Sequence, residues 1–168
     1  MRCWEFQGAS VRCLLPLLLL VSLSISGKAE AVENGVYPGV ANENRARINY
    51  MLNCQGCHGP GAEGNDAADV PRMKGFVGNF FRVAGGREFL VQVPGSSSAA
   101  VDDAQLAELL NWMIPHFSKN ELPSDYVPYT ESEVTRLRYT AEEDVAGKRR
   151  MLVDAIDKLA VPNSGDRE

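Results

Sequence analysis

The sequence predicts an all-α fold, because apolar residues recur at helical spacing and several expected helices begin with capping residues. The clearest helix begins at Asp102, where Gln105 three residues later completes a pattern that resembles a capping box. The apolar residues that follow have the i, i+3, i+4, i+7 spacing of a buried stripe: Leu106, Leu109, Leu110 and Met113. Pro115 is expected to end this helix near Met113.

The N-terminal 31 residues are expected to be a signal peptide (1–31). Arg2 and Arg12 supply positive charge, and Leu14 to Ile25 is a mostly apolar run. Ala29-Glu30-Ala31 then matches a small-residue cleavage site. The alternative is an uncleaved membrane anchor, but the apolar run is shorter than a spanning helix requires. We therefore expect export, with no stable membrane span after cleavage.

The remaining chain is expected to comprise an exposed lead-in (32–42), a main helical domain (43–118) and a C-terminal helical tail (119–168). A length of 168 residues suits one domain with appendages. The formal net charge of −5 gives no electrostatic support to a nucleic-acid-binding function. We therefore expect no nucleic-acid partner.

The stretch Cys54-Gln55-Gly56-Cys57-His58 is the attachment motif of a c-type haem. Each thiol adds to one porphyrin vinyl group, so the sulfurs must stand about one helical turn apart, and the adjacent imidazole reaches the iron. A zinc site would need two more ligands. The only other histidine is His116, and the other cysteines, Cys3 and Cys13, fall in the expected signal peptide. A thioredoxin-like redox pair belongs to a βαβ setting that this helical sequence lacks.

Two features flank this motif. A helix over 43–53 is expected to deliver the first cysteine, because Ala46, Tyr50 and Cys54 recur every fourth residue and share one face. Pro71 lies thirteen residues beyond His58. Because a proline keeps its carbonyl, Pro71 can accept a hydrogen bond from the Nδ1–H of a haem-ligating imidazole. The alternative is a turn proline without such a bond.

The most aromatic part of the chain runs from Phe76 to Val93, and a short helix is expected from Arg87 to Val93. Its aromatic side chains suit packing against a porphyrin or in an ordinary core. Arg82 and Arg87 are candidates to pair with haem propionates, or else solvated surface arginines. Residues 94–98 are expected to form a small polar loop.

The C-terminal tail is expected to start with a linker over 122–128 and to continue with two helices. Thr130 with Glu133, and Thr140 with Glu143, mark their starts. The second helix carries an apolar face made of Leu152, Ala155, Ile156 and Leu159. Such a tail can pack back on the main domain or engage a partner.

With these residues placed, the chain resembles the class I cytochromes c over about Glu43 to Phe117. The resemblance rests on the haem-attachment motif and on three flanking elements: Ala46 and Tyr50 in the preceding helix, the Pro71-x-Met73-x-Gly75 segment, and Leu109 and Trp112 in the final helix. It implies a cytochrome c-like helical fold around one covalent haem c, followed here by the C-terminal extension. It also implies that Cys54 and Cys57 tether the haem, that His58 is an axial iron ligand, and that the Pro71 carbonyl holds this imidazole.

The chain departs from this family at the second axial ligand. The family usually carries a methionine close to residues 94–98, where this sequence has none. Met73, Met51 and Met113 are better explained as packing residues or lie on the wrong side of the haem, and Met151 or His116 would require the tail or helix end to fold over the iron. The sixth ligand therefore stays unassigned.

The resemblance implies an electron carrier, not an enzyme, located in the periplasm because bacterial c-type haems are attached outside the cytoplasmic membrane. Its expected partners are redox proteins: a dehydrogenase, an oxidase or another cytochrome. The missing methionine leaves an alternative open, a haem-based ligand-binding or sensor module with an open sixth coordination site. A further alternative is a haem subunit of a larger dehydrogenase complex, docked through the tail.

Overall fold

The computed structural model describes residues 37–140 and 142–160, which belong to one compact unit beginning at Val32. The expected signal peptide (1–31) and most of the lead-in lie outside the described residues. The described part is mostly helical and contains no strand, only an isolated bridge between Asn65 and Val70, which confirms the all-α prediction. None of its helices combines the length and the apolar character needed to cross a membrane.

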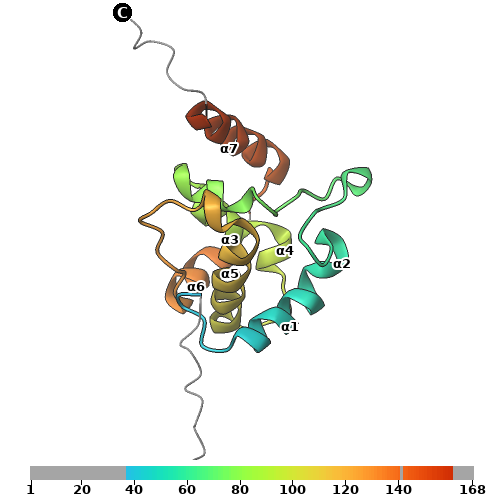
Figure 1. The fold of residues 1–168 in the computed structure, drawn as a ribbon, viewed down its shortest axis with the longest axis vertical. Helices are drawn as coiled ribbons and strands as arrows, with labels where there is room; N and C mark the ends of the chain where they lie inside the picture. Colours follow the sequence, from blue (N-terminus) through green and yellow to red (C-terminus); the bar gives the residue numbers. More distant parts are fainter. Residues whose placement is uncertain (1–36, 141, 161–168) are drawn as a thin grey trace, which may run out of the picture. The chain divides into compact units, whose positions relative to one another are not determined.

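The described chain is a succession of helices joined by short connections (Figure 1). The α-helices are α1 (Glu43–Asn53), α2 (Gln55–His58), α3 (Gly86–Gln92), α4 (Pro94–Ser97), α5 (Asp103–Ser118), α6 (Glu131–Arg138) and α7 (Val145–Ala160). The 3-10 helices are η1 (Asp66–Ala68), η2 (Val77–Arg82) and η3 (Lys119–Glu121). The expected polar loop at 94–98 is therefore largely the single turn α4, whose first residue, Pro94, has a backbone suited to a helix start.

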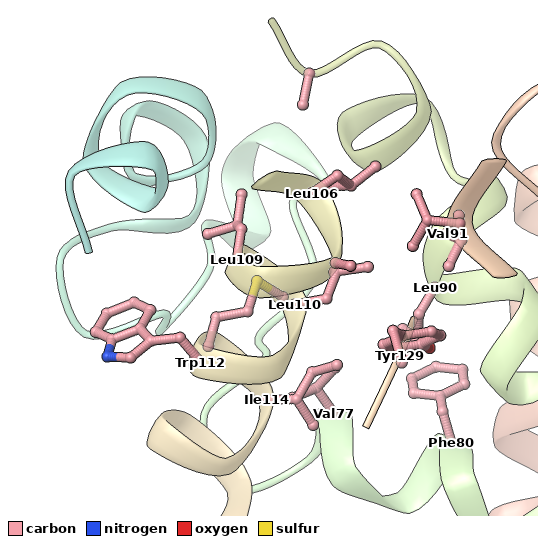
Figure 2. Packing of buried hydrophobic residues seen from close by; sticks show 14 of the residues in the cluster. Val77, Phe80, Leu90, Val91, Leu106, Leu109, Leu110, Trp112, Ile114 and Tyr129 are labelled. Atoms are coloured by element: carbon pink, nitrogen blue, oxygen red, sulfur yellow. The ribbon is translucent and has the colours of Figure 1, made fainter. Parts of the chain in front are cut away.

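Helix α5 is the centre of the fold, because α1, α6 and η2 all pack against it. Its predicted apolar stripe is buried and faces side chains of the other elements (Figure 2). The Asp102 side chain caps the helix by accepting a hydrogen bond from Gln105 N, as the capping pattern predicts. The prediction that the helix ends near Met113 is wrong, because α5 continues through Pro115 to Ser118.

Tertiary contacts explain why α5 continues beyond Pro115. Pro115 lacks the N–H that would bond the preceding turn, so local propensity disfavours this extension. The last turn is held from outside instead: the Phe117 carbonyl accepts a hydrogen bond from Gly75 N (2.8 Å), and Ser118 Oγ accepts one from Gly78 N (2.9 Å).

Helix α1 has the predicted bounds and packs on α5 through the predicted face. Asn42 caps it, and Ala46 and Tyr50 are buried. The Glu108 carboxylate of α5, itself only 4% exposed, accepts hydrogen bonds from the Ala41 and Asn42 amides and from the Arg45 guanidinium. These bonds fix the start of α1 to the middle of α5.

The C-terminal segment packs back on the same unit. Helix α6 begins as predicted, with Thr130 Oγ1 accepting a hydrogen bond from Glu133 N, and it contacts α5 and α3. Helix α7 contacts η2 and α3, and it buries Leu152 and Ile156 of the predicted face, whereas Leu159 is 61% exposed.

The predicted start of the last helix at Thr140 and Glu143 is wrong. Helix α7 begins at Val145, where the Asp144 carboxylate accepts a hydrogen bond from Gly147 N (2.8 Å). An aspartate is at least as good an N-cap as a threonine, so the later capping residue sets the boundary.

Candidate functional site

The residues Cys54 to His58 form a single helical turn that continues from α1. Cys54 N donates to the Tyr50 carbonyl (2.9 Å), and His58 N donates to the Cys54 carbonyl (3.0 Å). Gly59 ends the turn with φ +80°, a conformation that favours glycine. The two thiols and the imidazole are therefore carried on one turn of backbone, which is the spacing that haem attachment requires.

The His58 imidazole is held by the predicted partner. Its Nδ1 lies 3.0 Å from the Pro71 carbonyl oxygen, which confirms the predicted contact. Because a carbonyl can only accept, this hydrogen bond places the ring proton on Nδ1 and leaves the Nε2 lone pair available to a metal. In its neutral form the imidazole thus has the tautomer that a metal-ligating histidine needs.

The loop that brings Pro71 to His58 is closed by its own backbone bonds. Gly64 N donates to the His58 carbonyl (2.9 Å), and the Ala62 carbonyl accepts from both Met73 N and Lys74 N (2.9 Å each). The Tyr50 hydroxyl of α1 donates to the Gly59 carbonyl (2.7 Å), so the start of the loop is tied to the core. The His58–Pro71 contact is therefore the product of a structured loop rather than of chance proximity.

Burial disfavours ionisation of the first thiol of the motif, Cys54. Cys54 is partly buried against the core, and burial, with the nearby Cys57 thiol, raises the pKa of Cys54 to about 11. A redox dithiol needs a thiolate, whose formation this environment opposes. A thioether carries neither proton nor charge, so it suits the same environment.

The donor set fits a covalently attached haem. Cys54 offers a neutral thiol at the edge of the core, Cys57 offers an exposed one, and His58 offers a free Nε2. In residues 37–140 and 142–160, no group of three or more His, Cys, Asp or Glu side chains is arranged to hold a metal ion. The pair of cysteines thus has no further zinc ligands in this part of the chain.

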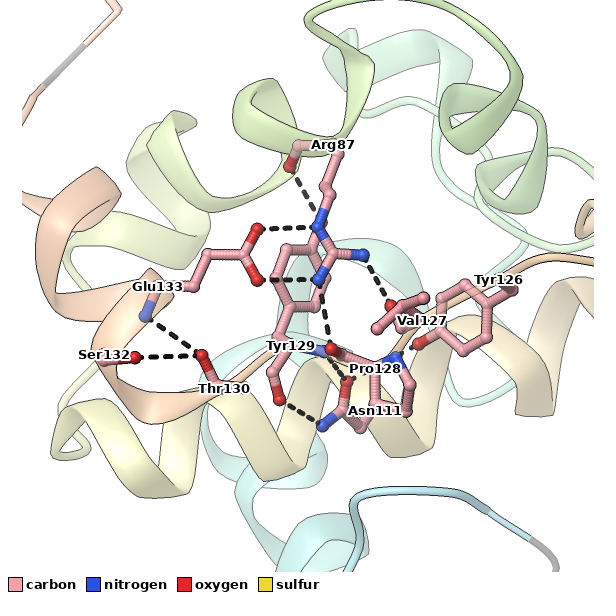
Figure 3. A network of polar contacts seen from close by, with 9 residues as sticks. All are labelled: Arg87, Asn111, Tyr126, Val127, Pro128, Tyr129, Thr130, Ser132 and Glu133. Atoms are coloured by element: carbon pink, nitrogen blue, oxygen red, sulfur yellow. Dashed lines mark hydrogen bonds and ion pairs between the residues drawn. The ribbon is translucent and has the colours of Figure 1, made fainter.

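The arginines considered as propionate partners have other partners. Arg87 forms a bidentate ion pair with Glu133 and donates to the carbonyls of Val127 and Pro128 (Figure 3). Arg82 Nε donates to the Glu121 carbonyl (2.7 Å). The expectation of a solvated Arg87 is therefore wrong, because its guanidinium is bound by the C-terminal segment.

The candidates for a sixth ligand are dispersed over the fold. Met51 and Met151 are exposed on α1 and α7, Met113 is buried in α5, and Met73 packs against the core. The His116 Nδ1 lies 2.8 Å from the Tyr37 hydroxyl, and its ring stacks on Trp112 at 4.5 Å between centroids. The sixth ligand stays unassigned.

Sequence reasoning missed two polar residues that bind the stretch before α5. Asn53, directly before Cys54, accepts a hydrogen bond from Ala100 N through its side chain (3.0 Å), and Arg138 binds the backbone around Ala99. Both contacts join residues far apart in sequence, and Arg138 shares α6 with another arginine, Arg136, so no local pattern distinguishes it.

Comparison with known proteins identified no relative of this chain. No family model matches the chain, and neither the curated proteins nor the solved structures gave a match.

Proposed function

We propose that this protein is an exported, periplasmic cytochrome that carries single electrons between redox proteins through one covalently attached haem c. The observation that carries the proposal is the hydrogen bond between His58 Nδ1 and the Pro71 carbonyl, formed directly after the two cysteines. A carbonyl so placed fixes the ring plane of a ligating histidine and increases its basicity. A surface histidine has no need of such a partner.

Three residues of the motif have defined parts in this function. The sulfurs of Cys54 and Cys57 hold the porphyrin by thioether bonds, and His58 Nε2 binds the iron. The Tyr50 hydroxyl keeps the chain after the histidine in place. The bound haem supplies the one-electron chemistry, and the polypeptide supplies binding, orientation and burial.

The contact between α1 and α5 supports the likeness to class I cytochromes c. Tyr50 of α1 and Trp112 of α5 lie 5.8 Å apart between ring centroids, and Tyr50 also contacts Phe117 at 5.0 Å. The family's first and last helices pair in the same way beside the haem-attachment motif. The cytochrome c-like arrangement remains part of the proposal.

A second candidate function is ligand binding at an open iron, as in a haem-based sensor. The observation that favours it is the composition of residues 94–101, which include three serines and no methionine. An iron without a thioether ligand has a lower potential and can accept a small molecule. Carbon monoxide added to the reduced protein separates the two functions, because only an accessible iron binds it rapidly.

Intact mass and absorbance test the proposal. The full chain is produced in a host that matures c-type cytochromes, and we expect the mass of one haem in addition to the polypeptide, with a Soret band. The Cys54→Ser/Cys57→Ser variant should lose both signals after denaturing extraction of haem. Gln55→Ala, which changes a residue between the cysteines, is the matched control and should keep them. A wild-type protein with bare polypeptide mass and no Soret band would refute the proposal.

A further inference from the structure

One arginine of the C-terminal segment binds the backbone of residues 97–101, called here the clamped segment. Arg138, the last residue of α6, is only 8% exposed. Its Nε donates to the Ser97 carbonyl (2.9 Å), its Nη1 to the Val101 carbonyl (2.8 Å), and its Nη2 to the Ala99 carbonyl. Nη1 also donates to Asp103 Oδ1 (2.9 Å) at the start of α5. One guanidinium thus satisfies three carbonyls of a short stretch.

The same segment is bound from another direction by α1. Ala100 N donates to Asn53 Oδ1 (3.0 Å), and Asn53 Nδ2 donates to the Asn49 carbonyl (2.9 Å), which fixes the orientation of the amide. Asn53 directly precedes Cys54. The clamped segment is therefore held between α6 and the residue next to the first cysteine of the haem-attachment motif.

A lysine in place of Arg138 would not reproduce this arrangement. The planar guanidinium presents N–H donors in fixed directions, and four of these bonds are made at once. An ammonium has a single nitrogen and three donors, so it cannot span three carbonyls and a carboxylate. The Thr135 hydroxyl, one turn earlier in α6, bonds Asp103 Oδ2 (2.7 Å) and keeps the two helices in register.

We propose that Arg138 and Asn53 are positioning residues that hold the clamped segment as a wall of the haem pocket. The inference rests on the proposed haem attachment, because the residue that accepts from Ala100 N directly precedes the cysteine that would carry the porphyrin. Solvent exposure is one of the factors that set a haem potential. Water stabilises the more highly charged oxidised iron, so a loosened wall lowers the reduction potential. Helix α6 thereby takes part in tuning the haem.

The test compares Arg138→Lys and Asn53→Ala with Arg136→Lys in the full, matured protein. Arg136 is exposed on the same helix and serves as the control. Two quantities are measured: amide hydrogen exchange in the clamped segment and the midpoint potential. Amides of the clamped segment should exchange about tenfold faster in both positioning variants, since Arg138→Lys loses charge-assisted hydrogen bonds and Asn53→Ala removes the acceptor of Ala100 N. The midpoint potential should fall by about 59 mV, which corresponds to a tenfold change in the equilibrium constant for one-electron reduction.

The outcomes separate this inference from the proposed function. A wild-type protein without a Soret band refutes haem attachment itself. A normal Soret band with an unchanged midpoint potential in both positioning variants overturns the inference, whatever happens to amide exchange. Because Asn53→Ala leaves α6 untouched, it provides the test on its own if Arg138→Lys fails to fold.

Discussion

Replacing Arg87 by alanine should destabilise the protein more than any ordinary surface change. The Arg87 and Glu133 side chains are 23% and 18% exposed, and their closest atoms are 2.6 Å apart. The guanidinium also donates to the Pro128 carbonyl (3.1 Å) and lies 4.2 Å from the centre of the Tyr129 ring. Its removal leaves a largely buried carboxylate and two carbonyls without these donors.

The magnitude follows from the burial of the partner. Breaking a fully buried ion pair by removing one member costs roughly 3–5 kcal/mol. Because both side chains keep about a fifth of their exposure, solvent reduces this cost, and we expect about 2–3 kcal/mol for Arg87→Ala. For a domain of this size, that loss lowers the melting temperature by roughly 5–10 °C.

Thermal unfolding followed by circular dichroism measures this effect. Arg136→Ala, on the exposed side of α6, is the matched control and should change the melting temperature little. A double-mutant cycle with Glu133→Gln isolates the coupling between the two side chains. A melting temperature for Arg87→Ala within about 2 °C of the control would refute the reasoning, since the network would then contribute no more than an exposed pair.

Three further predictions address pH, the buried carboxylate and the iron. The Arg87 guanidinium lowers the pKa of Glu133 below its usual 4.5, so the stability from this pair is present above that pH and is lost as the pH falls through the lowered value. Glu133→Gln should therefore flatten the acid side of the plot of unfolding free energy against pH. A slope identical to that of the wild type would contradict this assignment. Glu108→Ala leaves the Ala41 and Asn42 amides without their acceptor and should lower the free energy of urea unfolding by about 3 kcal/mol. A loss below about 1 kcal/mol would be inconsistent with the four hydrogen bonds that the Glu108 carboxylate accepts. Imidazole added to the oxidised, haem-loaded protein should shift the Soret band if the sixth position is accessible, and an unchanged spectrum would count against the ligand-binding candidate.

The elements foreseen from the sequence are those whose cause is local. The α5 stripe, the helix α1 over Glu43–Asn53 and the Thr130 cap each depend on residues a few positions apart. The His58–Pro71 contact spans thirteen positions, and it could be proposed because the chemistry of a ligating imidazole demands an acceptor.

Features that the sequence could not supply depend on distant partners. Pro115 remains helical because Gly75 and Gly78, some forty positions earlier, bond the last turn of α5. Arg87 and Arg138 look like ordinary surface arginines in a sequence, yet both are bound by segments at least thirty-five positions away. Long-range pairing of this kind leaves no periodic signal, so composition alone suggests the solvated alternative.

The ion pairs in the described part of the chain explain why the C-terminal segment packs with the rest of the fold. Arg45–Glu108 joins α1 to α5, Arg87–Glu133 joins α3 to α6, and Arg138–Asp103 joins α6 to α5. Two of these three pairs therefore require α6.

Without α6, the Arg87 guanidinium would lose the carboxylate that it binds, and the carbonyls of Ser97, Ala99 and Val101 would lose their shared donor. Val134, fully buried in α6, would also be missing from the core beside α5. Because backbone carbonyls left without partners inside a protein are costly, residues 97–101 would be driven to a different conformation. The last residue of α1 would then lose Ala100 as its hydrogen-bond donor, so the stability of α6 and the geometry beside Cys54 are physically linked.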